Sequence, residues 1–218
     1  SNIFCIFEAG LVWGGFHKRW DETKATLKVG GSTYWHGVQA GRILTYGTAT
    51  TAPVAEAAGL AKNRVYRVRP DISPSKSFAS VKTLIEQSEV AFIQYETYTA
   101  QQVYDAYVKD WNEWPASEGA PFTDVNGNGV YDKAVDIPGV PGADQTLWFV
   151  CNDMDETRTT TMYGSKPIGI ELQKTIWGYN TGGAIGNSIF TRNLVINKSG
   201  APIDSMFFTQ WSDPDLGG

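Results

Sequence analysis

Short segments that alternate apolar and polar residues, each closed by glycine, occupy both ends of this chain. The first set lies within residues 1–47, and the second follows Pro167. Alternation with a period of two is typical of half-buried strands, and glycine supplies the turns that hairpins need. Between the two sets, the apolar run from Thr146 to Cys151 predicts a buried strand, and the polar segment of residues 152–161 that follows it predicts a loop. We therefore predict a mostly β fold, an antiparallel β-sandwich.

Residues 78–114 follow a different pattern, because their apolar positions move towards the helical period of 3.6. An apolar stripe at this spacing ends at Trp111, and Thr99 with Gln102 forms a capping box ahead of it. One or two helices inserted between residues 78 and 114 are therefore expected. Such stripes usually face a core, so we interpret this one as a packing face. The 218 residues are expected to form a single β-rich domain.

Residues 124–136 carry oxygen-bearing side chains at every second position, around a turn that glycine forces. Five of them match positions 1, 3, 5, 7 and 9 of an EF-hand calcium loop. These five ligands are Asp124, Asn126, Asn128, the Val130 carbonyl and Asp132. An EF-hand also needs a glutamate at position 12, where this chain has Val135, and a following helix, where it has prolines and glycines.

Asp136, one residue later, is the expected replacement for the missing carboxylate in a shorter, non-helical loop. Calcium is the predicted cofactor, and its predicted role is structural because the site is all oxygen and has no histidine ligand. The alternative is an Asn-Gly turn that holds no metal.

Other segments carry weaker binding patterns. Asp213 and Asp215 form either half of a second calcium site or a simple turn. Asn197-Lys-Ser199 fits an N-glycosylation acceptor, and Ser205 lies in a D-S-M tripeptide that resembles a short O-glycosylation motif. Four tryptophans are candidates for stacking on a glycan, although most tryptophans are expected in the core. These four are Trp13, Trp20, Trp35 and Trp211.

Charge and hydropathy exclude two classes of protein. The net charge is −5, and the longest basic cluster is His17-Lys18-Arg19, so no nucleic-acid partner is expected. No run approaches the 18 to 20 apolar residues of a membrane span. The apolar run at residues 3–7 is too short for a signal peptide, which leaves a cytoplasmic protein or a mature fragment. Cys5 and Cys151 both lie in apolar runs, as buried thiols or as one bridge.

Four motifs together resemble a known family. They are W-N-E-W-P-x-x-x-G-A-P-F-x-D-V-N-G-N-G-V-Y-D, I-P-G-V-P-G-A-D-Q-T-L-W, Y-G-S-x-P-I-G-I-E and F-F-T-Q-W-S-D-P-D-L-G, within residues 8–218. They are similar to the N-terminal portions of large, mostly uncharacterised extracellular bacterial proteins that carry a type IX secretion sorting domain at the far C-terminus. The resemblance implies export, an extracellular or cell-surface location, and a chain that is a piece of a longer polypeptide. It implies no activity.

Catalytic signatures are scarce in this sequence. His17 and His36 lack the spacing of zinc ligands, and neither a G-x-S-x-G elbow nor a P-loop occurs. Glycoside hydrolysis needs only two carboxylates about 5 to 10 Å apart, so a carboxylate pair is the remaining enzymatic option. Candidates for that pair are Glu113, Glu118, Asp153, Asp155, Glu156 and Glu171.

Two functions follow from these patterns. The first is an extracellular structural or adhesive β module that calcium stabilises and that binds glycan or assembles with itself. Its partners would be other segments of the same large surface protein, copies of itself, or a polysaccharide. The alternative is a secreted hydrolase that acts on polysaccharide through a carboxylate pair.

Overall fold

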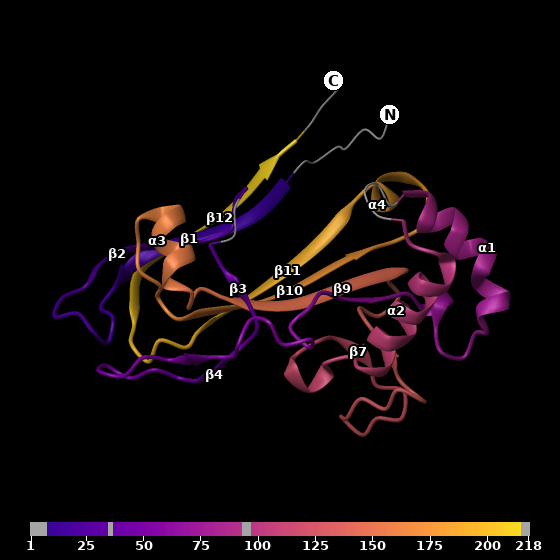
Figure 1. Cartoon of the computed structure of the whole chain (residues 1–218), viewed down its shortest axis with the longest axis horizontal. Helices are drawn as coiled ribbons and strands as arrows, with labels where there is room; N and C mark the ends of the chain where they lie inside the picture. The colour runs from indigo at the N-terminus through magenta and orange to yellow at the C-terminus, as the bar shows by residue number, and fades with distance from the viewer. Residues whose placement is uncertain (1–7, 35–36, 93–96, 215–218) are drawn as a thin grey trace. The chain divides into compact units, whose positions relative to one another are not determined.

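The computed structural model describes residues 8–34, 37–92 and 97–214 (Figure 1). The chain divides into two compact units. Unit 1 contains residues 1–64, 150–173 and 194–218, and unit 2 contains residues 65–149 and 174–193. The fold is mixed α/β, with several antiparallel sheets, a few helices and, within the described ranges, no closed barrel. The predicted antiparallel sheets and inserted helices are confirmed at this level.

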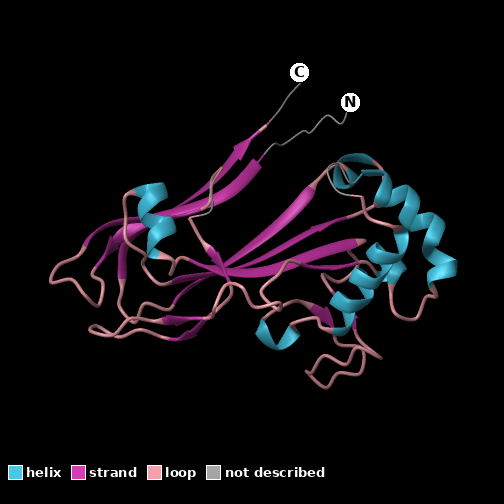
Figure 2. Ribbon diagram, in the orientation of Figure 1, coloured by secondary structure: helices cyan, strands magenta, loops and turns pink. Residues whose placement is uncertain are grey.

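Both units contain strands and helices (Figure 2). Unit 1 contains β1 (Glu8–His17), β2 (Thr26–Gly31), β3 (Gln39–Ala40), β4 (Ile43–Thr45), β5 (Val54–Ala55), α3 (Glu156–Tyr163) and β12 (Ile203–Asp213). Unit 2 contains β6 (Tyr66–Val68), η1 (Pro70–Ile72), α1 (Phe78–Ser88), η2 (Val90–Phe92), α2 (Ala100–Asn112), η3 (Ala116–Glu118), β7 (Phe122–Thr123), β8 (Ile137–Pro138) and α4 (Gly183–Gly186). Residues of both units belong to β9 (Gln145–Asn152), β10 (Ile170–Gly178) and β11 (Ile189–Asn197). Because these strands are shared, the division does not test the predicted single domain.

The three-stranded sheet of unit 1 has the order β12-β1-β2 and is antiparallel throughout. Its register places Leu11, Trp13 and His17 on one face, where all three are buried. Trp13 fits there only because its neighbour on β2 is Gly30, on which a Cβ would lie 2.6 Å from the indole nitrogen. Phe207 lies on the opposite face and is 72% exposed. One face of this sheet is therefore core and the other is an apolar surface.

Helix α3 corrects the sequence analysis, which predicted a polar loop after Asn152. Asp155 caps the first turn by accepting a hydrogen bond from the backbone N–H of Arg158. Gly164 ends the helix in the left-handed conformation, with φ of 62°. Thr159 is the buried residue of this short helix. Cap residues at both ends favour a helix even though the segment is polar.

A buried ion pair crosses the interior of unit 1. The Lys198 ammonium lies 2.7 Å from the Glu171 carboxylate and donates a second hydrogen bond to the Ile43 carbonyl, also at 2.7 Å. The same carboxylate accepts the Ile43 backbone N–H at 2.8 Å and the Gln173 side-chain amide at 3.1 Å. Glu171 is fully buried and Lys198 nearly so. The pair therefore joins β4, β10 and the segment after β11.

Unit 2 is built on helices α1 and α2, which lie side by side (Figure 1). Both fall inside the range predicted from the sequence, and Thr99 and Gln102 form the expected capping box. The predicted packing face of α2 is confirmed, because Val103, Tyr107 and Trp111 are buried. Four further buried residues of η1, α1 and α2 complete the core between the two helices: Ile72, Val81, Ile85 and Ala100.

Strand β9 is the predicted buried strand, and β6 pairs with it through Tyr66↔Trp148 and Val68↔Thr146. The five-stranded sheet to which it belongs has the order β11-β10-β9-β3, with β6 also on β9. Among the residues described, no helix is long and apolar enough to cross a membrane.

Replacing Lys198 by methionine should lower the free energy of unfolding by about 3–5 kcal/mol, because Glu171 then keeps a buried charge without its partner. Adding Glu171→Gln should recover part of this loss, since glutamine can still accept the Ile43 N–H and carries no charge. Urea denaturation of the single and double variants measures both effects.

Lys109→Met is the matched control, because Lys109 forms an exposed ion pair with Glu113 on α2. Its cost should stay below about 0.5 kcal/mol. Equal losses for Lys109→Met and Lys198→Met would contradict the role assigned to the buried pair.

Candidate functional site

The predicted calcium loop connects two short strands of unit 2. Strands β7 and β8 pair antiparallel through Phe122↔Pro138 and Thr123↔Ile137, at the two ends of the loop. A further backbone hydrogen bond joins Gly139 N–H to the Pro121 carbonyl at 2.8 Å. The loop of residues 124–136 therefore begins and ends at one place, although most of its side chains are exposed.

Asp124 organises the first half of this loop. Its carboxylate accepts the backbone N–H groups of Gly127, Asn128 and Gly129 at 2.7, 3.2 and 2.7 Å. Gly127 and Gly129 have φ of 72° and 75°, in the left-handed region that glycine tolerates best. The chain therefore wraps round one carboxylate.

Asp136 closes the second half. Its side chain is 2% exposed and accepts the backbone N–H groups of Val125 at 2.9 Å and Asp132 at 2.7 Å. Because Val125 follows the start of the loop, this carboxylate ties the two ends together. Asp136 was predicted as the replacement for the twelfth EF-hand position, and it occupies the closing position of the loop.

The remaining predicted ligands form local turns. Asn126 accepts the Asn128 N–H at 3.1 Å, Asn128 accepts the Val130 N–H at 2.7 Å, and Asp132 accepts the Ala134 N–H at 2.9 Å. Val130 was predicted to contribute its carbonyl, and its side chain is 66% exposed. Each side-chain oxygen in these bonds has a second lone pair.

A metal fits this donor set by chemistry, since carboxylate, amide and carbonyl oxygens are the ligands that calcium prefers. Among the residues that the structure describes, no three His, Cys, Asp or Glu side chains are grouped so as to hold a metal ion. Three of the six predicted ligands, Asp124, Asp132 and Asp136, belong to that class and are not grouped in this way. The other three, which are two asparagines and a backbone carbonyl, lie outside it. The calcium site therefore stays a prediction.

The C-terminal end of α2 holds the loop of residues 124–136 in place. The Trp111 indole N–H donates to the Lys133 carbonyl at 3.2 Å, and the Tyr131 hydroxyl donates to the Trp111 carbonyl at 2.8 Å. The Tyr131 ring also packs edge-on against Phe122, with centroids 5.6 Å apart. Trp111 is 7% exposed, so the loop packs against a fixed aromatic ring.

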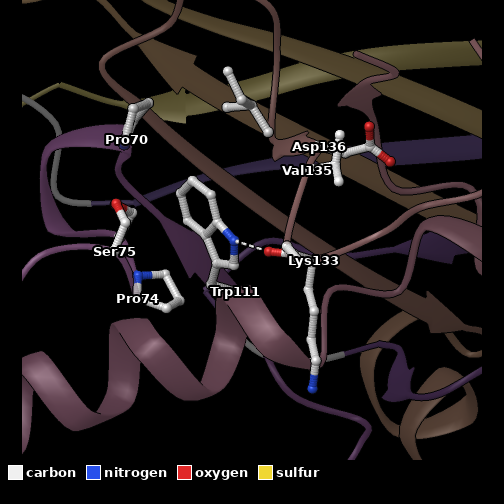
Figure 3. A pocket seen from close by; sticks show the side chains of 10 residues that line it. Pro70, Pro74, Ser75, Trp111, Lys133, Val135 and Asp136 are labelled. Atoms are coloured by element: carbon white, nitrogen blue, oxygen red, sulfur yellow. Dashed lines mark hydrogen bonds between the residues drawn. The ribbon is translucent and has the colours of Figure 1, made fainter. Parts of the chain in front are cut away.

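A pocket of about 480 Å³ lies beside the end of the loop (Figure 3). Trp111 and Asp136 line it from the loop side, and the segment from Pro70 to Ser75 lines the other side. The indole N–H points to the Lys133 carbonyl, while the Lys133 ammonium extends away from the ring. Any change in the last turn of the loop therefore changes a wall of this pocket.

The three candidate tryptophans that the structure describes do not form one surface. Trp13 is 1% exposed, which corrects its assignment as a glycan-stacking residue, because a ring enclosed by the core cannot meet a sugar. The register of β1 with β12 places Trp211 on the opposite face from Trp13, half-buried and edge-on to Tyr34 at 4.6 Å. Trp20 is half-buried beneath the Arg19 guanidinium, which lies 4.4 Å from its ring centroid. Trp35 lies outside the described residues.

The second calcium pattern and the two glycosylation motifs lie in the following surroundings. Asp213 accepts the Tyr34 hydroxyl at 2.8 Å, and Asp215 lies outside the described residues. The Asn197 side chain donates to the Ala201 carbonyl and accepts the Ser199 N–H in a turn. Ser205 is exposed, at an irregularity in the β1–β12 register, with φ of 52°.

The sulfur and imidazole candidates are only partly described. Cys151 is 6% exposed, and Cys5, with which it was paired in the bridge alternative, lies outside the described residues. His17 is buried, and its Nδ1 lies 3.2 Å from the Pro202 carbonyl. His36 also lies outside the described residues.

The candidate catalytic carboxylates mostly hold the backbone or pair with bases. Asp153 is fully buried and accepts three consecutive backbone N–H groups, those of residues 168–170, at 2.8 to 2.9 Å. Glu171 pairs with Lys198, and Asp155 caps α3. Glu156 pairs with Arg19, and Glu113 with Lys109. Five of the six candidate acids thus have a structural or ionic partner, and the sixth, Glu118, lies in η3.

The sequence patterns did not predict one cluster of aromatic side chains. Trp177, Tyr179 and Phe190 come together at the end of the β10–β11 hairpin. The signal was available, because the first two alternate before the N-T-G-G turn and the third opens the returning strand.

Gly129→Ala should lower the free energy of unfolding by about 1 kcal/mol, because alanine is strained at the left-handed φ of this position. A Cβ there would meet nothing within 4 Å, so the cost is conformational and not steric. Gly59→Ala is the matched control, since Gly59 is equally open but its φ lies outside that region. Equal effects of the two variants on chemical denaturation would contradict this role of Gly129.

Asp153 should make stability depend on pH. Burial raises the pKa of its carboxyl to about 6 from an ordinary 3.8, although three backbone N–H bonds oppose the rise. Because the folded pKa is the higher one, this contribution is full below about pH 4 and is lost as the pH rises through about 6.

Wild type should therefore gain stability relative to Asp153→Asn when the pH is lowered from 7.5 to 5. Denaturation at both pH values measures the difference. A gain on raising the pH would instead mean that the three N–H donors keep the carboxylate ionised.

Comparison with known proteins gives no relative to this chain. Neither a family model, nor a curated protein, nor a solved structure matches it. What the chain does is therefore inferred from its own residues and from the motifs quoted above.

Proposed function

We propose that this chain is an extracellular structural or adhesive module whose loop of residues 124–136 binds calcium. The observation that supports it best is the arrangement of Asp124 and Asp136. One carboxylate gathers three backbone N–H groups of the first half-loop, and the other ties the loop ends together. Between these two acids the sequence repeats short oxygen-bearing side chains at every second position, which is the pattern that a hard cation requires.

The metal would act on structure. The loop is held to α2 through Trp111 and Tyr131, so a cation bound there would hold the end of the helix and one wall of the adjacent pocket. An all-oxygen site without histidine favours a structural over a catalytic ion.

An apolar sheet face supports the adhesive or self-assembling part of the proposal. Phe16, Leu27 and Phe207 share the outer face of the β12-β1-β2 sheet and are 48%, 60% and 72% exposed. Exposed apolar surface of this kind is typical of interaction sites. Other segments of the same surface protein, or a second copy, are the proposed partners. Export to the cell surface rests on the resemblance of the four motifs.

The sandwich predicted from the sequence belongs to this proposal too. Its support is the two-faced β12-β1-β2 sheet, which buries Leu11 and Trp13 and exposes Phe207. The polysaccharide hydrolase is the weaker alternative, because two of its six candidate acids, Asp153 and Glu171, are buried among structural partners.

Calcium should raise the melting temperature of this chain by about 5 to 10 °C at about one hundred times its dissociation constant, relative to excess chelator. Asp124→Ala should abolish this shift. Asp132→Asn should reduce it, because asparagine can still accept the Ala134 N–H but carries no charge. A thermal melt in calcium and in chelator measures each variant.

Asp105→Asn is the control for a general loss of negative charge, since Asp105 is an exposed acid on α2. It should keep the full calcium shift. Identical wild-type melts in calcium and chelator would overturn the calcium site and leave an Asn-Gly turn.

A further inference from the structure

A second pocket in unit 2, of about 600 Å³, combines aromatic rings with one acid. Its lining comes from the start of β9, the β10–β11 hairpin and α4, and we call it the Trp177 pocket. The lining residues are Asp144, Trp177, Tyr179, Thr181, Ile185 and Phe190.

The three rings of the Trp177 pocket are arranged around Phe190. Trp177 stacks on it with centroids 5.7 Å apart and an interplanar angle of 19°. Tyr179 meets it nearly edge-on, at 5.7 Å and 76°. All three rings are half-buried, so they keep accessible surface while neighbours hold them in place. Rings in two nearly perpendicular planes can enclose a compact group better than a flat platform can.

Asp144 supplies the charge of this pocket. It is exposed, and its Oδ2 accepts the Asn180 N–H at 2.7 Å. Its own N–H donates to the Gly178 carbonyl at 3.1 Å, so the residue is fixed against the hairpin on both sides. Of the six lining residues, Asp144 alone is charged at neutral pH, and none is basic.

The aromatic rings and the carboxylate of this pocket both attract positive charge. The faces of aromatic rings carry negative charge density and attract cations, tryptophan most strongly. The Asp144 carboxylate adds a full negative charge beside them. An anion would be repelled, and a sugar would find few polar groups for its hydroxyls among mostly apolar side chains.

We propose that the Trp177 pocket binds an organic ammonium cation. The alkylated nitrogen lies against the Trp177, Tyr179 and Phe190 rings, and the Asp144 carboxylate offsets its charge. Apolar substituents on the nitrogen suit the apolar lining, and Ile185 in α4, which is 55% exposed, contributes to it. This binding is independent of calcium and of the proposed adhesive role.

The decisive probes are choline and its neutral isostere 3,3-dimethylbutan-1-ol, titrated into the whole chain by calorimetry with tetramethylammonium as a second cation. The two molecules have nearly the same shape and differ in charge, so their ratio isolates the electrostatic contribution. Choline should bind about tenfold more tightly, as expected for two or more cation–π contacts at a partly exposed site. The binding should weaken as salt is raised.

Two variants test the residues. Asp144→Asn and Trp177→Leu should each weaken choline binding at least about fivefold. Trp211→Leu, another half-buried tryptophan, should leave it unchanged. Circular dichroism shows whether each variant is folded, and Asp144→Asn, at an exposed position, gives the result if Trp177→Leu does not fold.

Trimethyllysine and phosphatidylcholine vesicles then identify the source of the ammonium group, as a modified side chain or as a lipid headgroup. Equal binding of choline and its isostere, no binding of either cation, or cation binding that both pocket variants leave unchanged would overturn the proposal. Preferential binding of neutral methyl glycosides would replace it by a sugar site. A calcium-dependent melt with no ammonium binding would leave the proposed function standing and remove this pocket alone.

Discussion

Carboxylates that accept backbone N–H groups hold the irregular parts of this protein in place. A buried N–H without a partner costs about 1–3 kcal/mol, and segments outside helices and sheets have no ladder to supply one. Asp153 takes three such groups at the start of β10, and Glu171 takes that of Ile43. Asp124 and Asp136 do the same for the exposed loop. The acids thus accept backbone N–H groups in the loop and at the first residues of strands.

The hydrogen bonds that these carboxylates accept limit the functions that each acid can have. A carboxylate committed to two or three N–H donors, as Asp153 is, has little freedom to meet a substrate. In the loop of residues 124–136, for which we propose calcium, the same hydrogen bonds shape the turn, and the Asp124 and Asp136 carboxylates keep further lone pairs. Asp144 differs from these residues, since it is exposed and faces an aromatic pocket. The role of an acid therefore depends on what surrounds it.

Aromatic residues follow a similar rule. Trp13 is enclosed above a glycine and belongs to the core, and Trp111 is buried where it anchors the loop of residues 124–136. Trp177 remains half-exposed because its partner Phe190 covers one face while the hairpin ends nearby. These three tryptophans thus have three different environments.

The sequence by itself determined the features that depend on neighbours along the chain. The capping box at Thr99, the strand of β9 and the turn of the loop at Gly129 are set within a few residues, where propensity and φ preference act. Helix α3 was missed although its caps at Asp155 and Gly164 are also local, because its polar composition outweighed them in the prediction.

Only the tertiary structure decided which distant residues meet. Lys198 and Glu171 pair across 27 positions, and the register of β1 with β12 put Trp13 in the core and Trp211 on the opposite face. The Trp177 pocket needs Asp144 beside a hairpin more than 30 residues later. Burial and register depend on the packing of whole strands, and a one-residue shift would turn every side chain to the other face. Local energies determine the elements, and their packing determines the sites.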